Sequence, residues 1–284
     1  EYYQIKLKVA PVYGPDHKVK VSDMKKLITS NTVVIVGSVP TYSAGVIDPI
    51  SELSELALKK GVGLHVDCCL GGFVLPWAKK LGYPVPEFDF SLPGVTSISV
   101  DTHKYGYSAK GSSVILYRNE ELRSYQYFTI TEWPGGIYFS PTFAGSRPGA
   151  LSAVCWANLI SIGEQGFMDA TKQILDVGGY IISEIEKIPE LYVIGDPLWN
   201  IAFASEEFNI YSLMDHMAKK NWTLAGLHKP SCVHICLTLR HAEPGVKERF
   251  ISDLKDSVRL VKENPKVEGG NAPVYGLAAS LPMR

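Results

Sequence analysis

Two short apolar runs separated by an amphipathic segment constrain the fold of this chain more than any other feature. The runs "NTVVIVGSV" (residues 31–39) and "VGLHVDCC" (residues 62–69) have the length and apolar content of buried strands. Between them, "DPISELSELALKKG" (residues 48–61) opens with an Asp cap and a proline at the first helical position, and ends at Gly61. A strand, a helix and a strand in this order predict parallel strands joined by a right-handed crossover. The chain is therefore expected to be an α/β protein with a mostly parallel sheet.

The same alternation extends through the first part of the chain. Residues 1–12 ("EYYQIKLKVAPV") read as a strand, and residues 22–30 ("SDMKKLITS") as a short helix with an N-cap serine. Residues 95–100 ("VTSISV") predict another strand, and residues 112–118 ("SSVILYR") a strand that pairs with it as a hairpin arm.

A change of pattern near residue 151 divides the chain. Residues 1–150 are expected to form the later part of a large domain. Residues 151–188 have apolar positions at helical spacing with glycine interruptions, which is typical of a helical connection between domains. Residues 189–284 alternate short strands and helices and predict a small C-terminal α+β domain with its tail.

Composition excludes several classes of protein. The chain has 284 residues, of which 46% are hydrophobic, and a formal net charge of -1. Scattered Lys and Arg give no footprint for nucleic acid or an anionic membrane. The apolar runs are much shorter than the roughly 20 residues that a membrane helix needs. Five cysteines, an odd number, suit a reducing compartment better than a disulfide framework. The chain as given is expected to be cytoplasmic.

The segment "SCVHICLTLR" brings together Cys232, His234 and Cys236 at alternate positions. As a strand, this segment would place Cys232 and Cys236 about 13 Å apart on one face. One tetrahedral zinc ion with Zn–S bonds of about 2.3 Å cannot bridge that distance. No metal site is therefore predicted here.

Ionisable residues follow two of the predicted strands. Asp67 ends "GLHVD", and Lys104 comes just after "VTSISVD". Ligands of open α/β sheets bind beyond the carboxyl ends of the strands. A lysine that attacks carbonyls must lose its proton, which burial and a neighbouring cation such as His103 would favour. An aspartate that keeps a pyridine nitrogen protonated would complete the arrangement that pyridoxal 5'-phosphate needs. Taken separately, the aspartate also fits a helix cap and the lysine a solvated loop.

Three segments in this order carry a resemblance to a known family: "HVDCCLGGF", "VTSISVDTHKYGYSAKGSSVILYRN" and "GGIYFSPTFAGSRPGA". They resemble the pyridoxal-phosphate-dependent sphingosine-1-phosphate lyases, relatives of the glutamate and aromatic amino acid decarboxylases. The resemblance covers roughly residues 1–250. It implies the fold-type I architecture of pyridoxal-phosphate-dependent transferases, and a homodimer with shared active sites.

The resemblance also implies roles for individual residues. Lys104 would bind the cofactor covalently, and Asp67 would contact its pyridine nitrogen. His103 would lie near the cofactor phosphate, and Ser146 would reach that phosphate from the partner subunit. Lys110 would grip the substrate phosphate. Three of these residues have an alternative interpretation. His103 also fits a strand-end histidine bonded to backbone, Ser146 an ordinary Gly–Pro turn, and Lys110 a solvated loop cation.

Tyr42, in "PTYSAGVIDP", follows another strand end and is a candidate to reach the reacting hydroxyl of the substrate. A phenol with an ordinary pKa near 10 needs neighbouring cations to act as a base. Core packing is the alternative for Tyr42. Cys69 matches a cysteine of the family motif and Cys68 a variable position, and both are expected to be small packed hydrophobes.

The resemblance implies a lyase that cleaves a long-chain base phosphate, a phosphorylated lipid, into phosphoethanolamine and a fatty aldehyde. An amino acid decarboxylase is the alternative enzyme, since the same cofactor stabilises both carbanions. A non-catalytic fragment is the third interpretation, because nothing here matches the upstream glycine-threonine loop of the family, and the chain is expected to be incomplete at its N-terminus. For a eukaryotic parent the resemblance implies an endoplasmic reticulum membrane protein with a cytosolic catalytic domain.

Overall fold

The computed structural model describes residues 3–14 and 16–263. The chain divides into two compact units. The first contains the chain up to Pro11, Val19–Pro40 and Asp48–Met168, and the second contains Val12–Lys18, Thr41–Ile47 and the chain from Asp169 onward. The division thus falls within the helical region predicted to connect two domains. Two short early segments belong to the second unit, which sequence order alone does not reveal.

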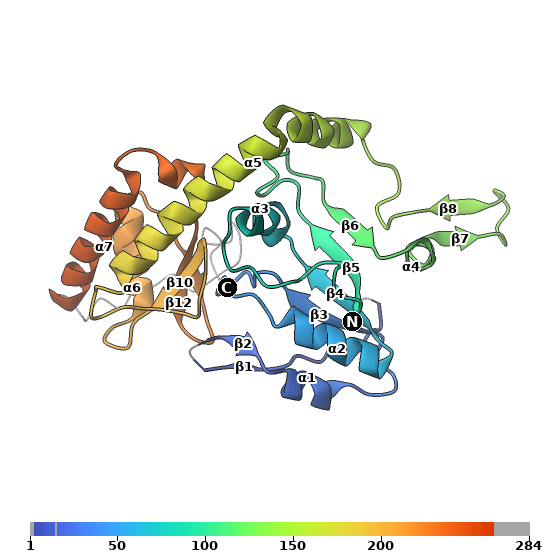
Figure 1. Ribbon diagram of the computed structural model, residues 1–284, viewed down its shortest axis with the longest axis horizontal. Helices are drawn as coiled ribbons and strands as arrows, with labels where there is room; N and C mark the ends of the chain where they lie inside the picture. The colour runs from blue at the N-terminus through green and yellow to red at the C-terminus, as the bar shows by residue number, and fades with distance from the viewer. Residues whose placement is uncertain (1–2, 15, 264–284) are drawn as a thin grey trace. The chain divides into compact units, whose positions relative to one another are not determined.

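The first unit is built on a four-stranded sheet in the order β3-β4-β5-β6 (Figure 1). Its strands are β3 (Val34–Ser38), β4 (Gly63–Asp67), β5 (Val95–Val100) and β6 (Val114–Tyr117). Strands β3, β4 and β5 run parallel, and β6 returns antiparallel to β5. A mostly parallel sheet with a hairpin arm was the prediction, and it is confirmed.

Alternation along β4 and β5 separates apolar from polar side chains. Val66 and Ile98 pair across the two strands and are buried on one face of the sheet. Because successive residues of a strand point to opposite faces, the polar residues share the other face. They are His65, Asp67, Ser97 and Ser99.

Short helices accompany this sheet: α1 (Val21–Leu27), α2 (Ile50–Lys60), α3 (Leu75–Lys80) after a 3-10 turn at Gly71–Phe73, and α4 (Glu120–Ser124). Helix α2 buries Ile50, Leu53 and Leu56 along one side, as its pattern predicts.

The predicted helix starts are each wrong by a residue or two. Helix α1 has Lys20 at its N-cap with no capping side chain, so Ser22 lies inside the helix. Helix α2 has Pro49 at its N-cap. The Asp48 carboxylate, one residue earlier, accepts a hydrogen bond of 2.8 Å from the Ser38 amide at the end of β3. Tertiary contacts therefore override the local capping signal.

The predicted strand at residues 1–12 is also wrong where the structure describes it. Residues 3–11 form no strand, and only β1 (Val12–Tyr13) pairs, with β2 (Lys18–Val19). Ile5 and Leu7 are 67% and 82% exposed. The alternating pattern of this segment is real, but no neighbouring strand pairs with it within the described chain.

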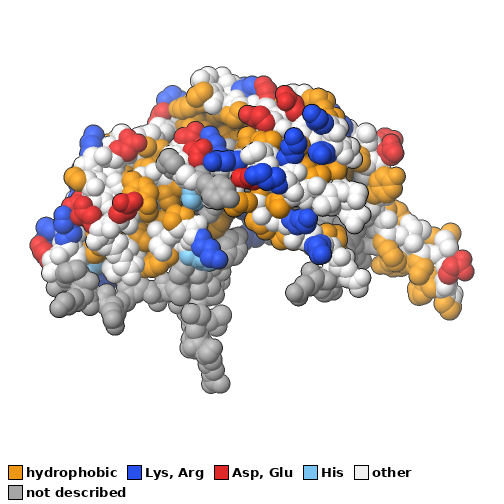
Figure 2. Space-filling view, turned by 90° about the horizontal axis from the view of Figure 1, so that it is seen from below, with side chains coloured by type: hydrophobic (Ala, Val, Ile, Leu, Met, Phe, Trp, Pro, Cys, Tyr) orange, Lys and Arg blue, Asp and Glu red, His pale blue; other side chains and the backbone are white. Residues whose placement is uncertain are grey.

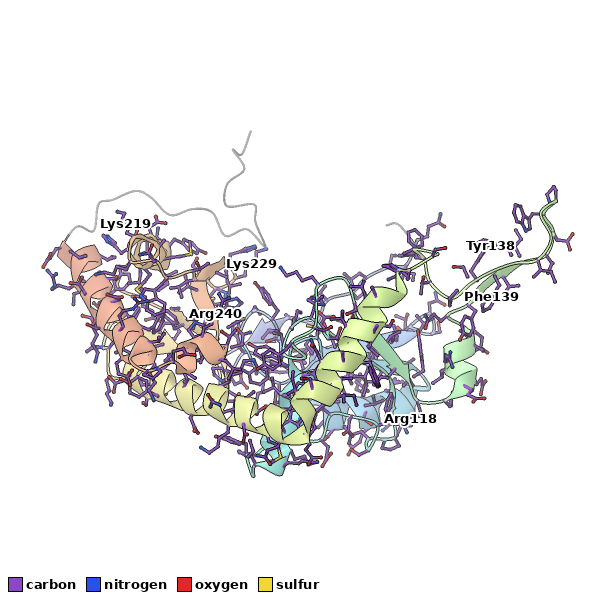
Figure 3. The ribbon with its side chains drawn as sticks, turned by 90° about the horizontal axis from the view of Figure 1, so that it is seen from above. Arg118, Tyr138, Phe139, Lys219, Lys229 and Arg240 are labelled. Atoms are coloured by element: carbon purple, nitrogen blue, oxygen red, sulfur yellow. The ribbon has the colours of Figure 1, made fainter. Side chains whose placement is uncertain are left out.

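Strands β7 (Phe128–Ile130) and β8 (Tyr138–Ser140) form a separate antiparallel hairpin. Figures 1 and 3 show this hairpin extending away from β6, with Tyr138 and Phe139 on it. The segment "GGIYFSPTFAGSRPGA" is rich in Gly and Pro, a composition that predicts no helix or strand of its own. Residues 138–140 contradict this prediction, because the four residues between Gly136 and Pro141 leave room for a three-residue strand.

Helix α5 (Gly149–Ile185) covers most of residues 151–188, the region predicted to be helical. It is kinked at Gly163, whose backbone is non-helical with φ 63°. Just after the kink and still within the first unit, Phe167 and Trp77 stack at 5.7 Å between ring centroids, which ties α5 to α3. No helix in the described ranges is both long and apolar enough to cross a membrane.

The second unit contains an antiparallel sheet in the order β11-β12-β10-β9. Its elements are β9 (Tyr192–Val193), β10 (Asn200–Ala204), α6 (Ile210–Lys219), β11 (Ala225–Leu227), β12 (Cys232–Cys236), a 3-10 turn at Leu239–Ala242 and α7 (Val246–Glu263). The predicted strand and helix order holds, and β11 is an additional strand. Residues 264–284 of the predicted tail lie outside the described residues.

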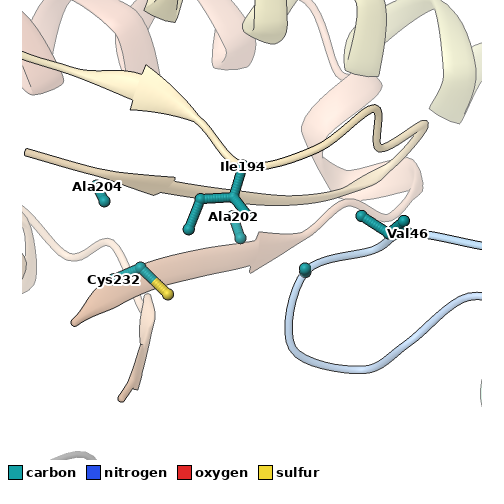
Figure 4. Close-up of a cluster of buried hydrophobic side chains, with 6 residues drawn as sticks. Val46, Ile194, Ala202, Ala204 and Cys232 are labelled. Carbon is teal, nitrogen blue, oxygen red and sulfur yellow. The ribbon is translucent and has the colours of Figure 1, made fainter. Parts of the chain in front are cut away.

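A small apolar cluster attaches the early segment 41–47 to this sheet (Figure 4). Val46 packs with Ile194 and Ala202, all of them nearly inaccessible to solvent. Cys232 is buried in the same cluster, and burial raises the pKa of its thiol to about 11. Among the described residues, no group of three or more His, Cys, Asp or Glu side chains is placed to hold a metal ion.

Candidate active site at the strand ends of the first unit

Asp67 and Lys104 follow neighbouring parallel strands. Asp67 is the last residue of β4 and pairs in register with Ser99 of β5, and Lys104 comes five residues after Ser99. The expectation that both lie at the carboxyl edge of one sheet is therefore confirmed. Their chemical roles stay a prediction.

The carboxylate of Asp67 is fixed by donors from two directions. Its Oδ1 accepts a hydrogen bond of 3.0 Å from the Cys69 amide and one of 3.2 Å from the Ser99 hydroxyl. The first belongs to the turn after β4, and the second crosses from β5. The position of this carboxylate thus depends on the pairing of the two strands.

Lys104 sits in the turn after β5 and is partly buried. Its Nζ lies 2.9 Å from Oδ2 of Asp101, and Oδ1 of Asp101 accepts a hydrogen bond of 2.7 Å from the Ser113 hydroxyl. The Lys104 amine also contacts the thiol of Cys69. An acidic partner and a thiol therefore flank the amine that is expected to bind the cofactor.

The expected depression of the Lys104 pKa is wrong. Partial burial does lower the pKa, but hydrogen bonds from the ammonium to Asp101 and Cys69 outweigh it, so the pKa lies above its ordinary value. The expectation considered only His103 as a charged neighbour of Lys104, whereas Asp101 contacts the amine directly. Lys104 must leave Asp101, or give it a proton, before its amine can attack a carbonyl.

The two cysteines after β4 differ. Cys68 is fully buried, and desolvation raises the pKa of its thiol far above the ordinary range, as expected for a packed hydrophobe. Cys69 lies between Asp67 and Lys104 and has hydrogen bonds to both side chains. The sequence analysis predicted only packing for Cys69 and missed its contacts with Asp67 and Lys104. The signal for them was the place of Cys69 two residues after Asp67.

The loop from Asp101 to Ser113 is held in place by its own polar groups and by α5. Thr102 is buried and its hydroxyl bonds to Ser112, and Asn158 of α5 donates to the Tyr107 carbonyl at 2.6 Å. The Tyr107 ring stacks near Phe167 with centroids 6.2 Å apart. The backbone carrying Lys104 is thus anchored on both sides.

Gly106 and Gly111 in "YGYSAKG" predict that each of these glycines supplies the conformational freedom for the backbone to fold back in this turn. Gly111 has φ 112° and does so. Gly106 is needed for space, because an added Cβ would lie 2.5 Å from the Thr102 carbonyl oxygen. The left-handed residue next to it is Tyr107, with φ 56°.

The remaining candidates lie in several environments. His103 donates from Nδ1 to the Ser112 carbonyl at 2.8 Å, and its Nε2 is 3.9 Å from Asp101. Lys110 and Ser146 are exposed. Tyr42 lies in the second unit, where its ring meets that of His234 edge-on with centroids 4.7 Å apart. The structure therefore brings Asp67, His103 and Lys104 together on one sheet edge.

The profile of the family described as "Pyridoxal-dependent decarboxylase conserved domain" matches residues 1–204. The chain belongs to this family. Its cofactor is accordingly pyridoxal 5'-phosphate, and the fold is that of fold-type I enzymes.

Similar proteins include two plant enzymes called sphingosine-1-phosphate lyase. The one from Oryza sativa is 49% identical and the one from Arabidopsis thaliana 48%, each over 100% of this chain and 52% of its own length. The chain thus spans about half the length of these relatives. A solved structure of sphingosine-1-phosphate lyase from Burkholderia pseudomallei has a TM-score of 0.88 and 44% identity, over 90% of this chain and 59% of that one.

The glutamate decarboxylase of Lactobacillus brevis is more distant, with a TM-score of 0.76 and 23% identity over 91% of this chain and 62% of that one. At this identity the likeness shows the fold alone.

The residues at the strand ends fit the cofactor of this family. An amine and a carboxylate stand after adjacent parallel strands, as a carbonyl-bearing pyridine requires. The hydroxyl of Ser108, four residues after Lys104, is buried and has no hydrogen-bond partner in the part of the chain that the structure describes. A buried hydroxyl without a hydrogen-bond partner is costly. The Ser108 hydroxyl could therefore donate a hydrogen bond to a bound ligand.

Proposed function

We propose that the protein containing this chain is a pyridoxal-phosphate-dependent carbon–carbon lyase. Its substrates would be long-chain base phosphates such as sphingosine 1-phosphate, and its products phosphoethanolamine and a fatty aldehyde. The observation that carries the proposal is the identity of 40–49% to proteins called sphingosine-1-phosphate lyase over the whole of this chain.

The cofactor, when bound, supplies the electron sink that stabilises a carbanion at the substrate carbon bearing the amine. Lys104 would hold the cofactor through its amine. Asp67 would keep a proton on the pyridine nitrogen. Tyr42 is proposed to take the proton of the substrate hydroxyl, and His103 and Ser146 to lie by the cofactor phosphate.

The decisive experiment supplies the intact protein with cofactor and a phosphorylated long-chain base, and follows fatty aldehyde and phosphoethanolamine. Formation of both products supports the lyase. An amino acid decarboxylase is the second candidate, favoured by the description of the matching family. Release of carbon dioxide from an amino acid, without cleavage of the lipid phosphate, would establish it instead.

Lys110 is proposed to bind the substrate phosphate. This exposed lysine belongs to the same anchored loop as Lys104. Lys110→Ala is expected to lower kcat/KM. The corresponding loss of transition-state stabilisation is about 1.5–3 kcal/mol, the value of a lost charge-assisted hydrogen bond. The visible absorbance of the lysine-bound cofactor should remain. Loss of that absorbance would move Lys110 to the cofactor, and unchanged kinetics would make it a solvated loop cation.

A homodimer is proposed in which Ser146 of one subunit lies at the active site of the other. The support is the apolar surface of the β7–β8 hairpin and the segment after it (Figure 2). Phe128, Ile137 and Phe143 are 58%, 77% and 80% exposed. Apolar side chains gathered on a surface mark an interaction site.

Sedimentation of the intact protein at micromolar concentration tests this assembly. A two-fold dimer is expected, and Ile137→Asp should shift it toward monomer because a charge would then be buried. A wild-type protein that sediments as a monomer contradicts the proposal.

A further inference from the structure

Four polar side chains on β4 and β5 form one continuous chain of hydrogen bonds that ends at Asp67. His65 Nδ1 lies 2.8 Å from the Ser97 hydroxyl, and His65 Nε2 lies 3.1 Å from the Ser99 hydroxyl. The Ser99 hydroxyl in turn lies 3.2 Å from Asp67 Oδ1. All four share the sheet face opposite to buried Val66.

The direction of every bond follows from the chemistry of the end group. An ionised carboxylate only accepts hydrogen bonds, so Ser99 must donate its single proton to Asp67. The Ser99 oxygen then accepts from His65, which must carry its proton on Nε2. A neutral imidazole with that proton has Nδ1 as an acceptor, so Ser97 donates to it. Ser97 thus donates to His65, His65 donates to Ser99, and Ser99 donates to Asp67, which only accepts.

The environment of His65 agrees with this neutral form. Burial lowers the pKa of His65, and the nearby charge of Asp67 opposes that effect without cancelling it. A neutral imidazole leaves Asp67 without a fixed cation at this end. The carboxylate charge therefore stays available to a cationic ligand, while Ser99 and the Cys69 amide hold Oδ1 in place.

We propose that Ser99 and His65 are positioning residues that orient the ionised Asp67 carboxylate toward the protonated pyridine nitrogen of the cofactor. This inference rests on the proposed roles of Asp67 and Lys104. Neither Ser99 nor His65 touches the reacting atoms. They act through Asp67, so removing them should weaken cofactor binding and not only the stability of the sheet.

Two serines on the same strand and the same sheet face provide a matched comparison. Ser99→Ala removes the bond to Asp67 together with the bond to His65 Nε2, whereas Ser97→Ala removes only the bond to Nδ1. We expect Ser99→Ala to weaken cofactor binding by roughly ten- to hundredfold, the usual effect of losing a hydrogen bond to a charged group. Ser97→Ala should change it by no more than about threefold, since its hydroxyl reaches Asp67 only through the ring.

The measurement is a titration of the cofactor-free intact protein with pyridoxal 5'-phosphate, followed by visible absorbance. Ser99→Thr keeps a hydroxyl and should restore binding to near the wild-type value. The unfolding midpoints of the two alanine variants should agree, which separates lost positioning from lost stability. Equal weakening by both alanine variants, or no rescue by threonine, overturns the inference.

A second measurement needs no cofactor. Nitrogen NMR of the histidine ring in the cofactor-free protein should show His65 neutral and protonated on Nε2, and a proton on Nδ1 overturns the proposed direction. Wild-type protein that binds no cofactor at all would defeat the proposed function. The tautomer of His65 would still be read out, so the two failures are distinguishable.

Discussion

Replacing Lys104 by alanine in the intact protein is expected to abolish the visible absorbance of lysine-bound cofactor and to lower kcat by at least about a thousandfold. The reason is that Lys104 directly follows β5, beside the strand end that carries Asp67, and is the residue expected to hold the cofactor covalently. Asp101 keeps its hydrogen bond to Ser113, so the turn should stay folded.

Lys110→Ala is the matched control, because it removes the same type of side chain from the same loop. Borohydride reduction followed by peptide mass analysis should place the cofactor on Lys104 in the wild type and in Lys110→Ala. A Lys104→Ala protein that keeps the absorbance, or a label on another lysine, contradicts the assignment.

Replacing Asp67 by asparagine is expected to have the next largest effect. The change keeps the shape of the side chain and removes its charge. A carboxylate and a pyridinium in contact attract by roughly 5 kcal/mol at an effective dielectric constant of about 20. With tenfold in rate for each 1.36 kcal/mol or so, the loss of kcat should reach about a thousandfold at saturating cofactor.

The measurement is kcat at saturating cofactor, together with the affinity for the cofactor. Asp176→Asn is the control, because Asp176 is an exposed acid of α5 paired with Lys172. It should leave both values unchanged. An Asp67→Asn enzyme with wild-type kcat would show that this carboxylate does not act on the pyridine nitrogen.

The order of helices and strands was predictable because local residue patterns indicate most of them. Buried strands such as residues 62–69 have the composition of sheet interiors, and α2 has an apolar stripe at helical spacing. The predicted strand at residues 1–12 failed for a different reason. Its alternation was clear, but a strand needs a neighbour to satisfy its backbone groups, and the sequence does not say where that neighbour is.

The residues of the candidate site also form two groups, those that a local sequence pattern indicates and those that only tertiary contacts reveal. Asp67 and Lys104 were found from their positions directly after apolar runs, which is a local signal. Asp101, Cys69 and Ser99 act on them through contacts that only the folded chain creates. The pKa of Lys104 was consequently predicted with the wrong sign, since the effect of Asp101 depends on the 2.9 Å contact made in the turn.

The sequence by itself determined the class of the fold, the two strand ends that carry ionisable groups and the resemblance to cofactor-dependent lyases, because each rests on residues close together in the chain. Only the tertiary structure decided that Ser99 faces Asp67, that His65 lies between two serines and that Tyr42 belongs to the second unit. Strand register and the burial of distant segments decide these contacts. Both are set by packing between residues far apart in the sequence, which no local pattern encodes.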